Sequence, residues 1–182
     1  MQIKKLAAMG DSLTEGYDIN QSKRWTNLLR KKHNLEILNF GISGDTTAGM
    51  IGRFPSEVLA SKPSHVFIMG GTNDLWLHLS ISQIIANIHA MVRQAKFHNI
   101  ISIIGIPPPV FQTDAFTTDT YFVDELSLGE KMKDFQQALK RYATEDERAF
   151  VDFSPMDVRL MLADGVHPNE EGQIWMANQW NL

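Results

Sequence analysis

The stretch MGDSLTEGY, from Met9 to Tyr17, contains the first serine of the chain, placed where an apolar run ends. A serine at such a place can cap a helix with its hydroxyl oxygen, or it can attack a carbonyl carbon as a nucleophile. Nucleophilic attack requires a general base, a group that orients the base, and hydrogen-bond donors for the oxyanion. Ser12 is therefore a candidate nucleophile only if the rest of the chain supplies all three.

Of the six histidines, His167 has the setting that best suits a general base. The segment DGVHPN places it in a turn bounded by Gly165 and Pro168, just before a predicted helix. Asp164, three residues earlier, is close enough to accept a hydrogen bond from His167 Nδ1, which would fix the tautomer and leave Nε2 facing the serine. The alternative is an ordinary turn in which His167 has no chemical role.

Two further polar segments offer donors for an oxyanion. In GISGDTT, Gly44 can bring its backbone N–H close to a ligand because it has no side chain. In GGTND, Asn73 offers a side-chain amide, and the N–H of Ser12 itself would be a third donor. The residue types thus predict an acyl-transfer site with Ser12, Asp164 and His167 as catalytic residues and Ser12, Gly44 and Asn73 as the oxyanion hole.

Phosphate binding and metal chemistry fit these segments less well. The glycine-rich segment 41–52 lacks the G-K-[ST] ending of a phosphate-binding loop, no G-x-G-x-x-G follows the first strand, and no H-E-x-x-H occurs. Asp11, Asp45 and Asp74 could gather around Mg²⁺, although carboxylates beside turn glycines are commonly turn formers. We therefore expect no metal and no cofactor.

The elements that must position these residues alternate between strands and helices. Short apolar runs without a polar alternation are typical of strands buried on both faces of a parallel sheet. Five such runs are found, at residues 3–9, 36–40, 65–69, 100–106 and 149–153. Between and after them, apolar residues spaced three and four apart predict helices. The helical stretches are residues 24–33, 81–97, 130–145 and 169–180, the last with Asn169 as its cap.

This order of elements predicts an α/β fold with crossover helices on both faces of the sheet. The segments GDSLTEG, GISGDTTAG and GGTND follow the first, second and third strands. Because the carboxyl ends of parallel strands lie at one edge, where ligands bind in such folds, we expect these segments to meet there. No linker or repeat divides the chain, and a single domain over residues 1–182 is expected.

Composition narrows the class of partner. The net charge is −4 and the 17 Lys and Arg residues are scattered, which disfavours nucleic-acid binding. The absence of cysteine excludes disulfides and thiolate chemistry and suits a reducing compartment. No stretch has the length of a membrane span or of a signal-peptide core. A cytoplasmic protein with no membrane anchor is therefore expected, and its oligomeric state is left open.

Four blocks of the sequence resemble the signature blocks of the SGNH hydrolases, or GDSL-type lipases, acylhydrolases and esterases. They occur in the order of that family and are GDSLT (10–14), NFGISGDTT (39–47), GGTND (70–74) and DGVHPN (164–169). The resemblance implies a flavodoxin-like three-layer α/β/α sandwich with a five-stranded parallel sheet. It also implies Ser12 as nucleophile and oxyanion donor, Gly44 and Asn73 as the other donors, His167 as base and Asp164 as its orienting group.

The resemblance implies hydrolysis of a small-molecule carboxylic ester through an acyl-enzyme, with short acyl groups expected for a small open cleft. Within the family, carbohydrate O-acetyl esterases, lysophospholipases and thioesterases are alternatives, because a fold does not define a substrate. An inactive ligand-binding module on the same scaffold and a metal-dependent phosphoesterase are alternatives of other classes.

Pocket residues are sought among the apolar side chains near the site. Those that could line a pocket are Leu75 and Trp76 after the third strand, and Phe111 and Phe116 in the proline-bearing segment 107–124. A loop of this length is often functional, although its aromatic residues could equally pack on the core.

Overall fold

A parallel β-sheet of five strands, in the order β2-β1-β3-β4-β5, forms the centre of the computed structural model, which describes residues 3–111 and 128–180. The strands are β1 (Lys5–Gly10), β2 (Glu36–Gly41), β3 (His65–Met69), β4 (Ile101–Ile106) and β5 (Phe150–Asp152). Each coincides, apart from small differences at its ends, with one of the five predicted runs. This strand order is that of flavodoxin-like folds, and the predicted fold class is confirmed.

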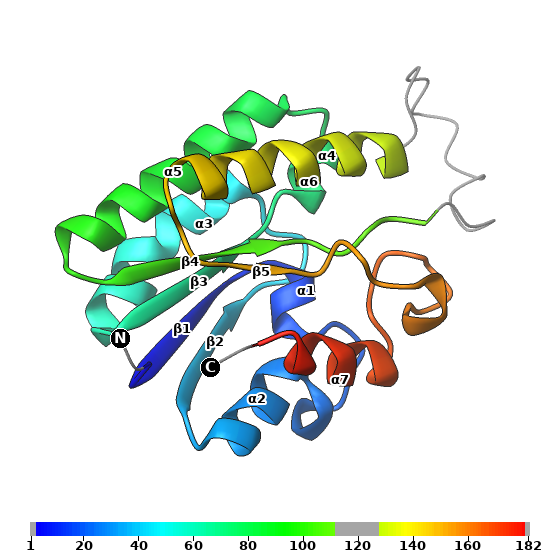
Figure 1. Cartoon of the computed structure of the whole chain (residues 1–182), viewed down its shortest axis with the longest axis horizontal. Helices are drawn as coiled ribbons and strands as arrows, with labels where there is room; N and C mark the ends of the chain where they lie inside the picture. Colours follow the sequence, from blue (N-terminus) through cyan, green and yellow to red (C-terminus); the bar gives the residue numbers. More distant parts are fainter. Residues whose placement is uncertain (1–2, 112–127, 181–182) are drawn as a thin grey trace.

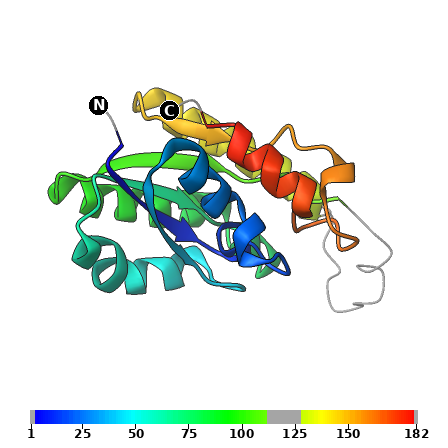
Figure 2. The same cartoon turned by 90° about the horizontal axis from the view of Figure 1, so that it is seen from below.

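Helices cover both faces of the sheet (Figure 1). The longer helices are α2 (Trp25–His33), α3 (Thr47–Phe54), α5 (Ile81–Phe97), α6 (Leu128–Glu145) and α7 (Glu170–Asn178), and the short ones are α1 (Ser12–Glu15), α4 (Thr72–Trp76), η1 (Gln21–Lys23), η2 (Pro55–Leu59) and η4 (Val158–Leu160). The helices α3, α5 and α6 lie on one face, and α2 and α7 lie together on the other (Figures 1 and 2). Among the residues described, no helix is long and apolar enough to cross a membrane.

A helix begins in each of the polar segments after the first three strands: α1 at Ser12, α3 at Thr47 and α4 at Thr72. Asp11 caps α1 and Thr46 caps α3, each with a side-chain oxygen that accepts a backbone N–H. Polar residues beside glycines thus act as helix caps at this edge.

The arrangement of β1 and β3 defines where a ligand can enter the sheet. The two strands are neighbours, with Gly10 opposite Met69 at their carboxyl ends. From β1 the chain crosses to β2 on one side, and from β3 it crosses to β4 on the other. A crevice forms outside the carboxyl ends of two strands from which the chain departs in opposite directions. The segments that contain Ser12 and Asn73 begin at this crevice.

An aromatic cluster fills the space between the sheet and the helices α2 and α7. Phe67 of β3 lies at its centre, with ring centroids 5.4 Å from Trp25, 5.1 Å from Trp180 and 6.2 Å from Phe153. Trp25 and Trp180 stack on each other at 5.6 Å. Because Trp25 comes from α2 and Trp180 lies two residues beyond the end of α7, the cluster fixes both helices against the sheet.

We predict that Phe67→Ala lowers the free energy of unfolding by ~3–5 kcal/mol, since it removes a buried ring and leaves a cavity among three aromatic neighbours. Urea denaturation followed by tryptophan fluorescence measures this change. The matched control is Phe97→Ala, because the side chain of Phe97 is 84% exposed, and its cost should stay within about 0.5 kcal/mol. Equal costs for the two variants would contradict the assignment of Phe67 to the core.

Candidate active site

Ser12 lies two residues after the end of the buried strand β1, at the first position of α1. A side chain at Gly10 would collide with Thr14 and with the carbonyl oxygen of Met69, so the chain passes from strand to helix in a space that only glycine fits. Asp11 then caps the helix through a 2.9 Å hydrogen bond from the Leu13 N–H to its Oδ1. The helix cap is therefore Asp11, and the hydroxyl of Ser12 is left available for another partner.

That partner is His167. Ser12 Oγ lies 2.9 Å from His167 Nε2, and His167 Nδ1 lies 2.7 Å from Asp164 Oδ2. The structure thus brings together the serine, histidine and aspartate that the sequence selects, in one chain of two hydrogen bonds. With Nδ1–H donating to the carboxylate, Nε2 is left as the acceptor that faces the serine hydroxyl.

The carboxylate of Asp164 is held as an anion. Its partial burial raises its pKa, but the N–H of His167, the imidazole and the N–H of Val166 outweigh this effect, so the pKa of Asp164 lies below its usual value. Both backbone N–H groups donate to Asp164 Oδ1, at 3.0 Å from His167 and 2.9 Å from Val166. The other oxygen, Oδ2, is thereby left to orient the imidazole.

The turn that carries His167 is anchored on both sides. The Phe111 N–H donates to the Gly165 carbonyl oxygen at 2.9 Å, and Gly165 has a φ of 69°, which favours glycine. After the turn, Asn169 caps α7, as the sequence predicts, and its Nδ2 donates to the carbonyl oxygens of Arg159 and Met161. His167 therefore projects from a braced turn rather than from a free loop.

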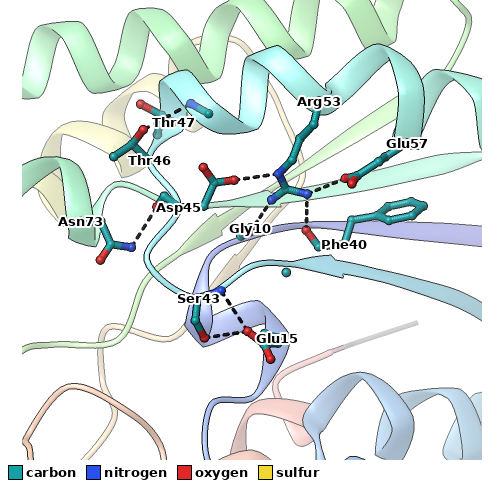
Figure 3. Close-up of polar contacts among 12 residues, drawn as sticks. Gly10, Glu15, Phe40, Ser43, Asp45, Thr46, Thr47, Arg53, Glu57 and Asn73 are labelled. Carbon is teal, nitrogen blue, oxygen red and sulfur yellow. Dashed lines mark hydrogen bonds and ion pairs between the residues drawn. The ribbon is translucent and has the colours of Figure 1, made fainter.

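Gly44 and Asn73 lie on segments that are bonded to each other (Figure 3). Asn73 Nδ2 donates to the carbonyl oxygen of Asp45, the residue after Gly44, at 2.9 Å. The side-chain amide nitrogen of asparagine has two protons, so one remains for a ligand. Gly44 is exposed with a φ of 80°, and a Cβ there would meet no atom within 4 Å. Its backbone therefore borders open space.

The residues predicted to line a pocket have different surroundings. Leu75, one of these candidates, is only 2% exposed and belongs to the core between the sheet and α5 and α6. Trp76 is half-buried on α4. Phe111 is half-buried and packs against the core cluster on the α2 and α7 side. Phe116 and most of segment 107–124 lie outside the described residues.

Tyr17 is a residue of the site that sequence reasoning missed. Its ring centroid lies 4.4 Å from that of His167, with 33° between the ring planes, and its side chain is 45% exposed. Gly16, in the left-handed conformation with φ 85°, ends α1 and turns the chain so that Tyr17 can reach the imidazole. The signal in the sequence was an aromatic residue just beyond a capping glycine.

The carboxyl group of Asp11, the residue before Ser12, is fully buried. Burial raises its pKa, the Leu13 N–H lowers it, and the nearby carboxylates of Asp74 and Asp45 raise it further, to about 7. Its Oδ2 has no hydrogen-bond partner within residues 3–111 and 128–180. Asp11 thus caps α1 with a carboxyl group whose ionisation is disfavoured by burial.

The three aspartates considered for Mg²⁺ have separate protein partners. Asp45 pairs with Arg53 at 2.7 Å, and Asp74 accepts hydrogen bonds from the N–H and hydroxyl of Thr47. Asp11 accepts from Leu13. Within the part of the chain that the structure describes, no group of three or more His, Cys, Asp or Glu side chains is arranged to hold a metal ion.

Comparison with known proteins agrees with this geometry. The family model described as the GDSL-like lipase/acylhydrolase family matches residues 8–174. Because the match covers most of the 182 residues, the chain belongs to this family, as its four sequence blocks predict. It is accordingly an enzyme, a hydrolase of carboxylic esters.

Individual relatives support the same assignment. Esterase TesA of Pseudomonas aeruginosa is 26% identical over 173 residues, covering 90% of this chain and 79% of that protein. A shorter match, 43% identical over 76 residues, covers 38% of this chain and 31% of the uncharacterized lipoprotein YqeF of Bacillus subtilis. A lipolytic protein of the G-D-S-L family from Desulfitobacterium hafniense has a solved structure with a TM-score of 0.83, 27% identity and 97% coverage of both chains.

The raised pKa of Asp11 predicts a pH-dependent stability. Between pH ~4 and ~7 the folded protein retains a proton that the unfolded chain has lost, so this group lowers the free energy of unfolding as the pH rises. Asp11→Asn keeps an oxygen for the cap but cannot ionise. We expect its stability relative to the wild type to improve from pH 4 to pH 8, measured by urea denaturation.

The matched control for this measurement is Asp134→Asn, because Asp134 is exposed on α6. This variant should differ from the wild type by the same small amount at every pH. A constant difference for Asp11→Asn as well would mean that its carboxyl group titrates alike in the folded and unfolded chains.

Proposed function

We propose that the enzyme hydrolyses its ester by nucleophilic catalysis at Ser12. Ser12 Oγ attacks the carbonyl carbon while His167 Nε2 takes the hydroxyl proton, and Asp164 stabilises the imidazolium that forms. His167 then gives this proton to the departing alkoxide, which leaves as the alcohol. Water, deprotonated by His167, cleaves the acyl-enzyme and releases the acid. The observation that carries the proposal is the 2.9 Å contact between Ser12 Oγ and His167 Nε2.

The oxyanion of each tetrahedral intermediate would rest on three donors. These are the N–H of Ser12 at the start of α1, the N–H of Gly44 and the side-chain amide of Asn73. In support, Gly44 borders open space and Asn73 is oriented by its bond to Asp45, both at the crevice that Ser12 enters. Fixed donors of this kind stabilise charge without reorganising during the reaction.

For the substrate we propose small esters with short acyl groups. Exposed apolar side chains stand on the three segments of the site: Tyr17 beside His167, Ile42 before Gly44, and Leu77 just after α4. They offer apolar contact at the surface rather than an enclosed tunnel. Carbohydrate acetyl esters, lysophospholipids and thioesters are the alternatives, and a chain-length profile on p-nitrophenyl esters, compared with these substrates, separates them.

A ligand-binding module without turnover is the alternative of another class, and any serine-dependent ester hydrolysis excludes it. No specific observation favours it, because every side chain that the mechanism requires is present. A cytoplasmic location stays a prediction that rests on the lack of cysteine, and the absence of nucleic-acid partners stays one that rests on the scattered charge.

We predict that Ser12→Ala and His167→Ala each abolish hydrolysis of p-nitrophenyl acetate, since one removes the nucleophile and the other its base. A fluorophosphonate probe should add once to the wild type at Ser12 and not to Ser12→Ala, as intact-mass measurement would detect. The matched control is His98→Ala, an exposed histidine directly after α5 that should leave the rate unchanged. Full activity in either site variant, with a native circular dichroism spectrum, would overturn the mechanism.

Asn73→Ala tests the oxyanion hole separately. Removing one donor that acts in the transition state should lower kcat by ~10²-fold or more and change KM much less. Steady-state kinetics on p-nitrophenyl acetate measures both constants. An increase in KM alone would assign Asn73 to substrate binding instead.

A further inference from the structure

Arg53, in the last turn of α3, makes the most extensive set of side-chain contacts near the site (Figure 3). Its side chain is only 15% exposed. The group donates to two backbone carbonyl oxygens, Gly10 at 2.8 Å and Phe40 at 2.7 Å, and to two carboxylates, Asp45 at 2.7 Å and Glu57 at 2.5 Å. Three of these four partners belong to segments that lead into the site.

The first partner fixes the approach to the nucleophile. Gly10 is the last residue of β1, two positions before Ser12. Its carbonyl oxygen accepts from Arg53 Nη2 and also from the N–H of Ile42, at 3.1 Å. The end of β1 is therefore bonded both to Arg53 and to the segment that contains Gly44.

The other two partners fix the segment of the oxyanion donors. Phe40 lies in β2, shortly before Gly44, and Asp45 directly follows Gly44. The carbonyl of Asp45 also receives the Asn73 amide at 2.9 Å. One guanidinium thus connects, directly or through Asp45, the three stretches of chain that present the N–H groups of Ser12 and Gly44 and the amide of Asn73.

Gly44 itself has little that could hold it. It has no side chain, it is exposed, and its φ of 80° lies outside the range that most residues adopt. Its neighbours are restrained instead: Asp45 by Arg53 and, on the other side, Ser43 by Glu15 of α1. Glu15 Oε2 accepts from the Ser43 N–H at 2.9 Å and from the Ser43 hydroxyl at 2.6 Å. The direction of the Gly44 N–H therefore depends on two bonded neighbours.

We propose that Arg53 is a positioning residue for the oxyanion hole, an inference that rests on the proposed function. It touches no reacting atom, and it acts by fixing the Gly44–Asp45 segment and the end of β1 relative to each other. An error of ~1 Å in the position of a catalytic group can cost ~10²-fold in rate. The planar fork of arginine offers five N–H donors spread over three nitrogens, whereas the ammonium of lysine offers three from a single nitrogen and cannot span all four of these acceptors.

Arg53→Lys is the direct test. The variant keeps the charge but loses most of the fork, and we expect kcat for p-nitrophenyl acetate to fall ~10–10²-fold with KM changed less than about threefold. The matched control is Glu57→Gln, which alters a partner of Arg53 that lies outside the oxyanion segments and should leave kcat within about twofold. Urea denaturation at the assay temperature verifies that each variant is folded under the conditions of the assay.

A double-mutant cycle separates positioning from a general structural effect. If Arg53 acts through the oxyanion donors, the kcat loss of Arg53→Lys combined with Asn73→Ala is smaller than the product of the two single losses. Losses that multiply, or an unchanged kcat in Arg53→Lys, would overturn the proposal. Asp45→Asn, which keeps the carbonyl that binds Asn73 but weakens the pair with Arg53, gives the same cycle if Arg53→Lys does not fold.

The rates of Ser12→Ala, subtracted as background, keep the two proposals distinct. An active Ser12→Ala variant refutes the proposed mechanism, whatever Arg53 does. If Ser12→Ala is inactive and the kcat losses of Arg53→Lys and Asn73→Ala multiply, the proposed role of Arg53 is refuted and the proposed mechanism stands.

Discussion

The turn from Gly10 through Asp11 to Ser12 is the constraint on which the rest of the structure depends. β1 is paired on both sides, and at its end the chain must enter α1 in a space without room for a side chain at Gly10. Asp11 caps the helix with a carboxyl group whose pKa its burial raises. Ser12 is thereby fixed at the crevice between β1 and β3, and the other groups of the site must lie within reach of it.

Parallel pairing brings these groups to one place, because β1, β2 and β3 end at the same edge of the sheet and each continues into a polar segment. Sheet pairing alone does not orient these segments. Hydrogen bonds to charged groups hold them, with Arg53 between Gly10 and Asp45 and Glu15 beside Ser43. Burying ions rarely adds much stability, so their value here is in selecting one arrangement of the backbone.

The sequence predicted what depends on local pattern. Apolar runs located all five strands, and a three-residue spacing linked His167 to Asp164 because one turn of chain can close that contact. It could not locate the ring contact between Tyr17 and His167 or the contacts of Arg53 to β1 and β2, since these join residues far apart in the chain. Nor could it reveal that Leu75 is buried in the core, because position after a strand does not show which way a side chain faces.

The hydrogen bond between Ser12 and His167 joins residues 155 positions apart. At a synthesis rate of ~5–20 residues per second, the ribosome makes the histidine roughly 8–30 s after the serine. During that interval β1 and its neighbours can pair, but under the proposed mechanism Ser12 has no base. The nascent chain would therefore be inert toward cellular esters, and reactivity would begin only when the turn carrying His167 closes over a sheet that has already formed.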